Sequence, residues 1–173
     1  ISQLQEYINK KKNRWLFGHL SYDLKNRLEA LSSQHQDHIQ FPDIFFFEPS
    51  VLTSLNEHFM TIWADDPREI FNEINAIILQ GPGSKPVRDI RINNRIQKEE
   101  YLSIIQKLRR HILRGDCYEI NFCQEFFSEA VDIDPLSVYK KLNDISPNPF
   151  SALYKLEEKW LLCASPERFL KKE

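Results

Sequence analysis

Glycine is scarce in this sequence, with 4 residues among 173. Loops that cradle phosphate depend on glycine, and the absence of both Gly-x-Gly-x-x-Gly and a P-loop nearly excludes those two kinds of nucleotide site. The cysteine count of 3 is small and odd, which argues against a disulfide scaffold. It favours a reducing compartment and predicts a cytoplasmic protein. No apolar run approaches the roughly 20 residues that span a bilayer.

An excess of one charge sign is also lacking. The formal net charge is −2, so there is no electrostatic reason to expect nucleic acid or a membrane as a partner. Hydrophobic residues make up 42% and charged residues 28%, which is ordinary for a soluble globular protein. The chain starts at Ile1 with neither an initiator Met nor the apolar region of a signal peptide. We therefore expect it to begin inside a longer protein.

Helical spacing of apolar residues predicts three helices in the first half of the chain. Two of them cover residues 2–11 and 22–31. The third starts at Asp66-Pro67, with Asp as the N-cap and Pro in the first turn, and its apolar stripe ends at Gly81. Strands are predicted at residues 14–20, 44–47 and 58–64. Residues 81–94 hold Gly-Pro-Gly-Ser-Lys-Pro and then alternating charge, which is typical of a linker.

The second half of the chain mixes the same kinds of element. A helix that begins near Tyr101 carries one apolar face and ends at Gly115. Residues 118–126 alternate between apolar and polar side chains, which predicts a strand with one packed face. Asp134-Pro135 starts a further helix, and residues 150–156 and 160–165 form a predicted hairpin. Because helices and strands interleave while hairpins are present, the predicted fold class is α+β.

Glu167 is the first candidate for a chemical role. It follows Ser165-Pro166 at the end of a predicted strand. A carboxyl group held there beside a cavity, partly out of water, can act as a general acid that protonates a departing hydroxyl. The alternative is a surface salt bridge with Arg168 or Lys171, since exposed pairs of this kind are common.

Several motifs, in this order, resemble the chorismate-binding domain of the aminodeoxychorismate synthase component I family, one of the chorismate-utilising enzymes. They are Gly-Asp-Cys-Tyr-Glu-Ile-Asn-Phe at 115–122, Pro-Phe-Ser-Ala at 149–152 and Ala-Ser-Pro-Glu-Arg-Phe at 164–169. Gly-His-Leu-Ser-Tyr-Asp at 18–23 resembles the N-terminal portion of the family, with His19 where Tyr is typical.

The resemblance carries expectations about domains and fold. Residues 1–92 would be the end of the N-terminal domain of the synthase, and residues 93–173 the first part of the chorismate-binding domain. The family fold stacks two β-sheets in a core with helices outside, and this chain would hold part of that sandwich.

The resemblance also assigns roles to single residues. In this family the Glu of Ser-Pro-Glu-Arg acts as the general acid/base, which points to Glu167. Glu119 stands where relatives carry Gln, or Lys in the branch that activates water. It could orient ammonia or ammonium, or it could be a polar residue on a partly wet strand face. Pro149, Phe150 and Ser151 match a segment that lines a tryptophan pocket away from the chemistry. The alternative is a helix-breaking turn.

The implied reaction replaces the 4-hydroxyl of chorismate with an amino group and gives 4-amino-4-deoxychorismate, in para-aminobenzoate and folate biosynthesis. The implied partners are chorismate and a glutaminase subunit that supplies ammonia. Tryptophan is a further ligand that the resemblance suggests. Mg²⁺ is the implied cofactor, with ligands expected beyond Glu173, so the chain alone is expected to be inactive. Two alternatives stay open. One is anthranilate synthase component I or another chorismate-utilising enzyme, and the other is a non-catalytic fragment that binds tryptophan or a partner.

Two further features do not predict a site. His35-Gln36-Asp37-His38 has weak metal-ligand spacing and no third ligand cluster in the sequence. Cys163 has no predicted His neighbour that could activate its thiolate, so catalysis by this cysteine is not expected.

Overall fold

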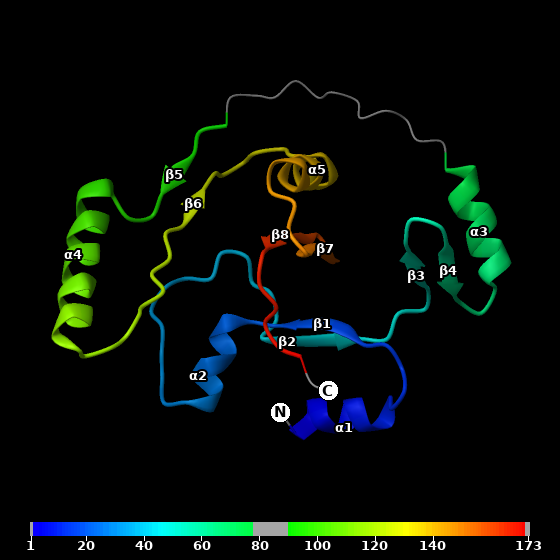
Figure 1. The fold of residues 1–173 in the computed structure, drawn as a ribbon, viewed down its shortest axis with the longest axis horizontal. Helices are drawn as coiled ribbons and strands as arrows, with labels where there is room; N and C mark the ends of the chain where they lie inside the picture. Colours follow the sequence, from blue (N-terminus) through cyan, green and yellow to red (C-terminus); the bar gives the residue numbers. More distant parts are fainter. Residues whose placement is uncertain (1, 78–89, 172–173) are drawn as a thin grey trace. The chain divides into compact units, whose positions relative to one another are not determined.

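The structure is a computed structural model that describes residues 2–77 and 90–171. The chain divides into two compact units, Ile1–Gly81 with Lys155–Leu161 and Pro82–Tyr154 with Leu162–Glu173. Helices and small sheets alternate along the chain (Figure 1), so the fold class is α+β as predicted. Each sheet among the described residues has two strands. The assignment of residues 1–92 and 93–173 to two domains of a synthase stays a prediction.

The first unit begins with a helix and a two-stranded antiparallel sheet. The sheet pairs β1 with β2, with Phe17 opposite Phe47 and Leu20 opposite Ile44. Gly18 lies so close to β2 that an added Cβ would stand 1.9 Å from the carbonyl oxygen of Phe45, so only glycine allows this pairing. The elements are α1 (Ser2–Lys10), β1 (Phe17–Leu20), the 3₁₀ turn η1 (Tyr22–Leu24), α2 (Lys25–Leu28) and β2 (Ile44–Phe47).

The same unit continues with a hairpin and a capped helix. The strands β3 (Leu52–Leu55) and β4 (Met60–Trp63) pair antiparallel. The helix α3 (Pro67–Ala76) starts where predicted, because the Asp66 carboxylate accepts the backbone N–H groups of Arg68 and Glu69. It ends at Ala76, since Ile77 has an extended backbone with ψ 106°. The helix therefore ends before the predicted stop at Gly81, and that part of the prediction is wrong. Most of the predicted linker lies outside the described residues.

The second unit contains α4 (Lys98–Arg114), the longest of the described helices. Gly115 caps it in the left-handed conformation with φ 87°, as its position in the sequence predicts. The helix α5 (Pro135–Ile145) is capped by the Asp134 carboxylate, which accepts from Leu136 N and Ser137 N. This unit also holds β5 (Asn93–Asn94) and β6 (Phe126–Phe127). The strands β7 (Phe150–Leu156) and β8 (Lys159–Ser165) are divided between the units, because Lys155–Leu161 belongs to the first.

The predicted strand at residues 118–126 is wrong. Only Phe126–Phe127 is a strand, and it pairs with Asn93–Asn94. A strand needs hydrogen bonds from a neighbouring strand. Because β5 has two residues and pairs only with Phe126–Phe127, residues 118–125 have no partner strand in the described part of the chain. Phe122 packs on Tyr101 of α4, with ring centroids 5.5 Å apart. Tyr118 is 92% exposed.

Apolar side chains remain widely exposed in both units. Among the described residues only Leu24 is buried. The apolar face of α4 includes Ile112, which is 37% exposed, and Ile145 at the end of α5 is 85% exposed. Monomeric soluble proteins rarely leave large apolar patches in water. The described elements therefore do not complete a hydrophobic core by themselves.

Candidate functional site

The hairpin of β7 and β8 brings two of the sequence motifs to one end of a sheet. Both strands have seven residues, and they are joined by Glu157 and Glu158, of which Glu157 has a positive φ of 53°. Because the two strands run antiparallel and match in length, the start of β7 and the end of β8 lie together. Phe150 and Ser165 occupy these two positions.

The turn after β8 is closed by Ser165. Its hydroxyl Oγ donates to the backbone oxygen of Glu167 at 3.1 Å and lies 3.4 Å from the backbone N of the same residue. A serine that bonds to the backbone two residues on is a common turn former. The turn fixes the backbone of Glu167 directly beyond the last strand residue.

The Glu167 side chain is exposed. The sequence predicts a partly buried carboxylate that faces a cavity, and this environment is absent among the described residues. A residue at the end of a strand is buried only when another element packs over that end of the sheet. The described residues supply no such element over Glu167. The acid/base role of Glu167 stays a prediction.

Arg168 contacts the other motif. Its guanidinium carbon lies 5.1 Å from the centroid of the Phe150 ring, within the range of a cation–π contact. The predicted acid/base segment and the predicted tryptophan segment are therefore direct neighbours. The sequence does not reveal this contact, because it depends on the register of the hairpin.

The predicted tryptophan segment, Pro149, Phe150 and Ser151, covers the end of the entry turn and the first two residues of β7. Ser151 donates to the Asn148 carbonyl oxygen twice, from its backbone N at 3.2 Å and from Oγ at 2.9 Å. The Asn148 side chain donates in turn to the carbonyl oxygen of Ser146 at 3.0 Å. The alternative of a helix-breaking turn is therefore part of the structure, while a tryptophan pocket stays a prediction.

Glu119 lies outside any strand and is exposed. The predicted strand alternation, which would place it and Asn121 on the face toward Glu167, is not present. Its role as a second catalytic residue stays a prediction that the geometry of the described residues does not support.

Sequence reasoning missed a charged cluster at the C-terminal end of α4. Arg114 Nε lies 3.0 Å from both carboxylate oxygens of Asp116, and His111 Nδ1 lies 2.7 Å from Asp116 Oδ2. The hydrogen bond from Arg114, followed by that with His111, lowers the pKa of Asp116. Beside it is a shallow hollow of about 270 Å³ lined by Lys107, Arg110, His111 and Arg114. The spacing of three or four residues between these basic side chains could have predicted that they share one face of the helix.

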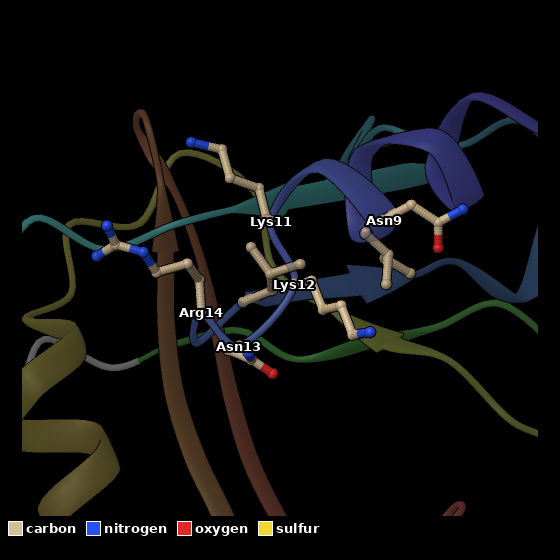
Figure 2. Close-up of a pocket in the computed structure, with 7 residues that line it drawn as sticks. Asn9, Lys11, Lys12, Asn13 and Arg14 are labelled. Carbon is tan, nitrogen blue, oxygen red and sulfur yellow. The ribbon is translucent and has the colours of Figure 1, made fainter.

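A second hollow, of about 470 Å³, lies at the turn after α1. Lys11 Nζ bonds to Glu48 Oε2 at 2.7 Å, and Arg14 Nη1 lies 3.6 Å from Glu48 Oε1. This hydrogen bond raises the pKa of Lys11 and lowers that of Glu48. Figure 2 shows Lys11 and Arg14 pointing to one side and Lys12 to the other. Lys11 and Arg14 are already paired with Glu48 and Lys12 points away from them, so the three cations do not form a site for a further anion.

Metal ligands are not assembled in the described residues. No group of three or more His, Cys, Asp or Glu side chains there could hold a metal ion. The described residues therefore offer no ligand set that fits Mg²⁺. Cys117, Cys123 and Cys163 are free thiols. Among the described helices, none is both long and apolar enough to cross a membrane.

Comparison with known proteins identifies the family. The profile of the family described as chorismate binding enzyme matches residues 1–173, so the chain belongs to this family. It is 27% identical over 163 residues to aminodeoxychorismate synthase component 1 of Escherichia coli, a match that covers 90% of this chain and 34% of that protein. It is 25% identical over 168 residues to anthranilate synthase component 1 of Thermus thermophilus, with coverage of 90% and 36%.

A solved structure shares the fold. Anthranilate synthase component I from Streptococcus pneumoniae matches with a TM-score of 0.78 at 18% sequence identity, over 96% of this chain and 43% of that chain. At that identity the likeness shows the fold alone. The chain spans about a third of the length of the curated relatives it matches. Two different activities occur among these relatives at nearly equal identity, so similarity alone does not separate them.

Proposed function

We propose that this chain contributes to a component I enzyme that aminates chorismate to 4-amino-4-deoxychorismate, in para-aminobenzoate and folate biosynthesis. Membership of the chorismate binding enzyme family supports chorismate as the substrate. The observation that carries the choice of product is Pro149-Phe150-Ser151-Ala152, which resembles the para-aminobenzoate branch. The corresponding segment of anthranilate synthase component I has Asn-Pro-Ser-Pro-Tyr-Met.

In this proposal Glu167 is the general acid/base that acts on the departing hydroxyl. Two features support it: Glu167 lies in Ser165-Pro166-Glu167-Arg168, and the Ser165 turn fixes its backbone. The exposed side chain would be covered once the rest of the family fold is in place, because the chain spans about a third of its curated relatives.

Two further components belong to the proposal through the family. A glutaminase subunit would supply ammonia, and Mg²⁺ would bind the substrate carboxylate when present. The described residues hold no group that fits a metal ion. The proposal also includes a binding site for tryptophan, formed by Pro149, Phe150 and Ser151. A cytoplasmic location is proposed from the low cysteine count.

Complementation tests the proposed product. The complete gene product that contains these residues should restore growth of a bacterial strain that requires para-aminobenzoate, when a glutaminase subunit or excess ammonium is supplied. It should not restore a strain that lacks anthranilate synthase component I. Growth of the second strain alone would favour the anthranilate alternative. Growth of neither strain, with the protein present in the cell extract, would favour a binding role without catalysis.

A further inference from the structure

The contact between Arg168 and Phe150 links two segments that the sequence predicts to serve separate pockets. Both residues belong to the second unit, one just after β8 and one at the start of β7. The guanidinium carbon of Arg168 stands 5.1 Å from the ring centroid of Phe150. The proposed mechanism gives no role to either side chain.

Glu167 lies between two anchors. On its N-terminal side the Ser165 hydroxyl bonds to the backbone of Glu167. On its C-terminal side the next residue, Arg168, rests on Phe150. Phe150 is half-buried and begins a strand whose entry turn is closed by the Ser151 bonds to Asn148. The Phe150 ring is therefore held in one position. Arg168 has a long side chain that would sample many rotamers without this contact.

We infer that Arg168 is a positioning residue: it packs on Phe150 and thereby keeps the Glu167 carboxylate oriented toward the departing hydroxyl. This inference rests on the proposed function of Glu167. It gives Phe150 a task in the acid/base segment, in addition to any task in ligand binding. A general acid must be aimed at its proton acceptor within a narrow range, and a residue held on both sides satisfies that need.

Turnover of the complete gene product with chorismate and ammonium tests the link. Phe150→Leu keeps an apolar side chain and removes the aromatic ring, and Arg168→Gln removes the cation. Each should lower kcat by about two- to five-fold, the factor that corresponds to an exposed cation–π contact, while KM for chorismate stays unchanged. The double variant should lose no more than either single variant, because both remove one contact. Phe150→Tyr should retain wild-type kcat.

A matched control uses another cation–π pair of the same unit. Arg95 lies over Phe127 with its guanidinium carbon 3.7 Å from the ring centroid, and neither residue belongs to the hairpin end motifs of the proposal. Phe127→Leu should leave kcat unchanged. Additive losses in the double variant, a rise in KM with kcat intact, or a Phe150→Tyr variant as slow as Phe150→Leu would each overturn the inference.

An activity-independent readout separates this inference from the proposed function. Hydrogen exchange of peptides that cover residues 165–169 should be faster in Phe150→Leu than in the wild type, and unchanged in Phe127→Leu. If the wild-type protein has no turnover, the proposed function fails, and faster exchange still supports the link. Unchanged exchange in Phe150→Leu contradicts the link whatever the turnover.

Discussion

At the scale of single residues, the placement of Glu167 follows from short-range chemistry and its surroundings do not. The Ser165 hydroxyl shapes the turn, and the Arg168 guanidinium lies over the ring of Phe150. Both contacts form within one hairpin. Burial of the carboxylate would require atoms from a further layer over the sheet end, and the exposed state of Glu167 reflects the absence of such a layer from the described residues.

Glu167→Gln in the complete gene product should remove turnover and retain chorismate binding. The amide keeps the size of the side chain and cannot donate the carboxyl proton, and loss of a positioned acid or base costs about 10²–10⁴-fold in rate. Steady-state kinetics and calorimetric titration with chorismate measure the two effects. Glu158→Gln, an exposed glutamate in the hairpin turn, serves as the control and should turn over normally. Near-normal turnover of Glu167→Gln would reject the acid/base role.

Asp116 should make the end of α4 sensitive to acid. Arg114 and His111 lower its pKa below the ordinary value of 3.8. The stabilising contribution of the carboxylate is therefore complete above that value and is lost as the pH falls through the lowered pKa of the folded state. With ¹⁵N-labelled glycine, the Gly115 amide signal should shift in that acidic range. Asp116→Asn should abolish the shift and Asp144→Asn should preserve it. A shift that persists in Asp116→Asn would contradict this assignment.

At the scale of helices and strands, local signals were sufficient where one residue decides the outcome. Asp66 and Asp134 cap α3 and α5 as predicted, and Gly115 ends α4 with the expected positive φ. The hairpin of β7 and β8 was also predicted with nearly the observed limits. These features depend on neighbours within a few residues, which the sequence displays directly.

Pairing between distant segments was harder to predict. Residues 118–125 have the alternation of a strand and lack a partner strand among the described residues, while β3 was missed because Leu52-Thr53-Ser54-Leu55 has two polar residues at its centre. The contact of Arg168 with Phe150 was missed for a similar reason. Strand formation and side-chain contacts across a hairpin depend on register, which is set by non-local packing.

The N-cap of α3 gives a quantitative test at this scale. Asp66→Ala should destabilise the complete gene product by about 0.5–2 kcal/mol, because two backbone N–H groups lose their acceptor. Denaturant unfolding measures the change. Asp65→Ala alters the preceding carboxylate, which does not cap the helix, and should change the stability far less. Equal effects of the two substitutions would show that charge, and not the cap, stabilises α3.

At the scale of the whole chain, the described residues leave most apolar side chains accessible, with Leu24 alone buried among them. The chain also spans about a third of the curated relatives, and its described part lacks a metal-binding group. These three facts lead to one expectation: the activity of the family requires further residues.

The 173 residues alone should therefore not convert chorismate with ammonium and Mg²⁺. The physical reason is that the described residues hold no group that fits a metal ion and that the chain spans about a third of its curated relatives. Incubation followed by chromatography measures the conversion, with the complete gene product as the positive control. Formation of aminodeoxychorismate by the 173 residues alone would overturn this expectation.

The central claim is the identity of the product, and one assay tests it directly. The complete gene product is incubated with chorismate, ammonium and Mg²⁺, and the products are separated and identified by mass. The proposal predicts 4-amino-4-deoxychorismate as the product and predicts no anthranilate. Anthranilate as the product would contradict the proposal and would favour the alternative, anthranilate synthase component I.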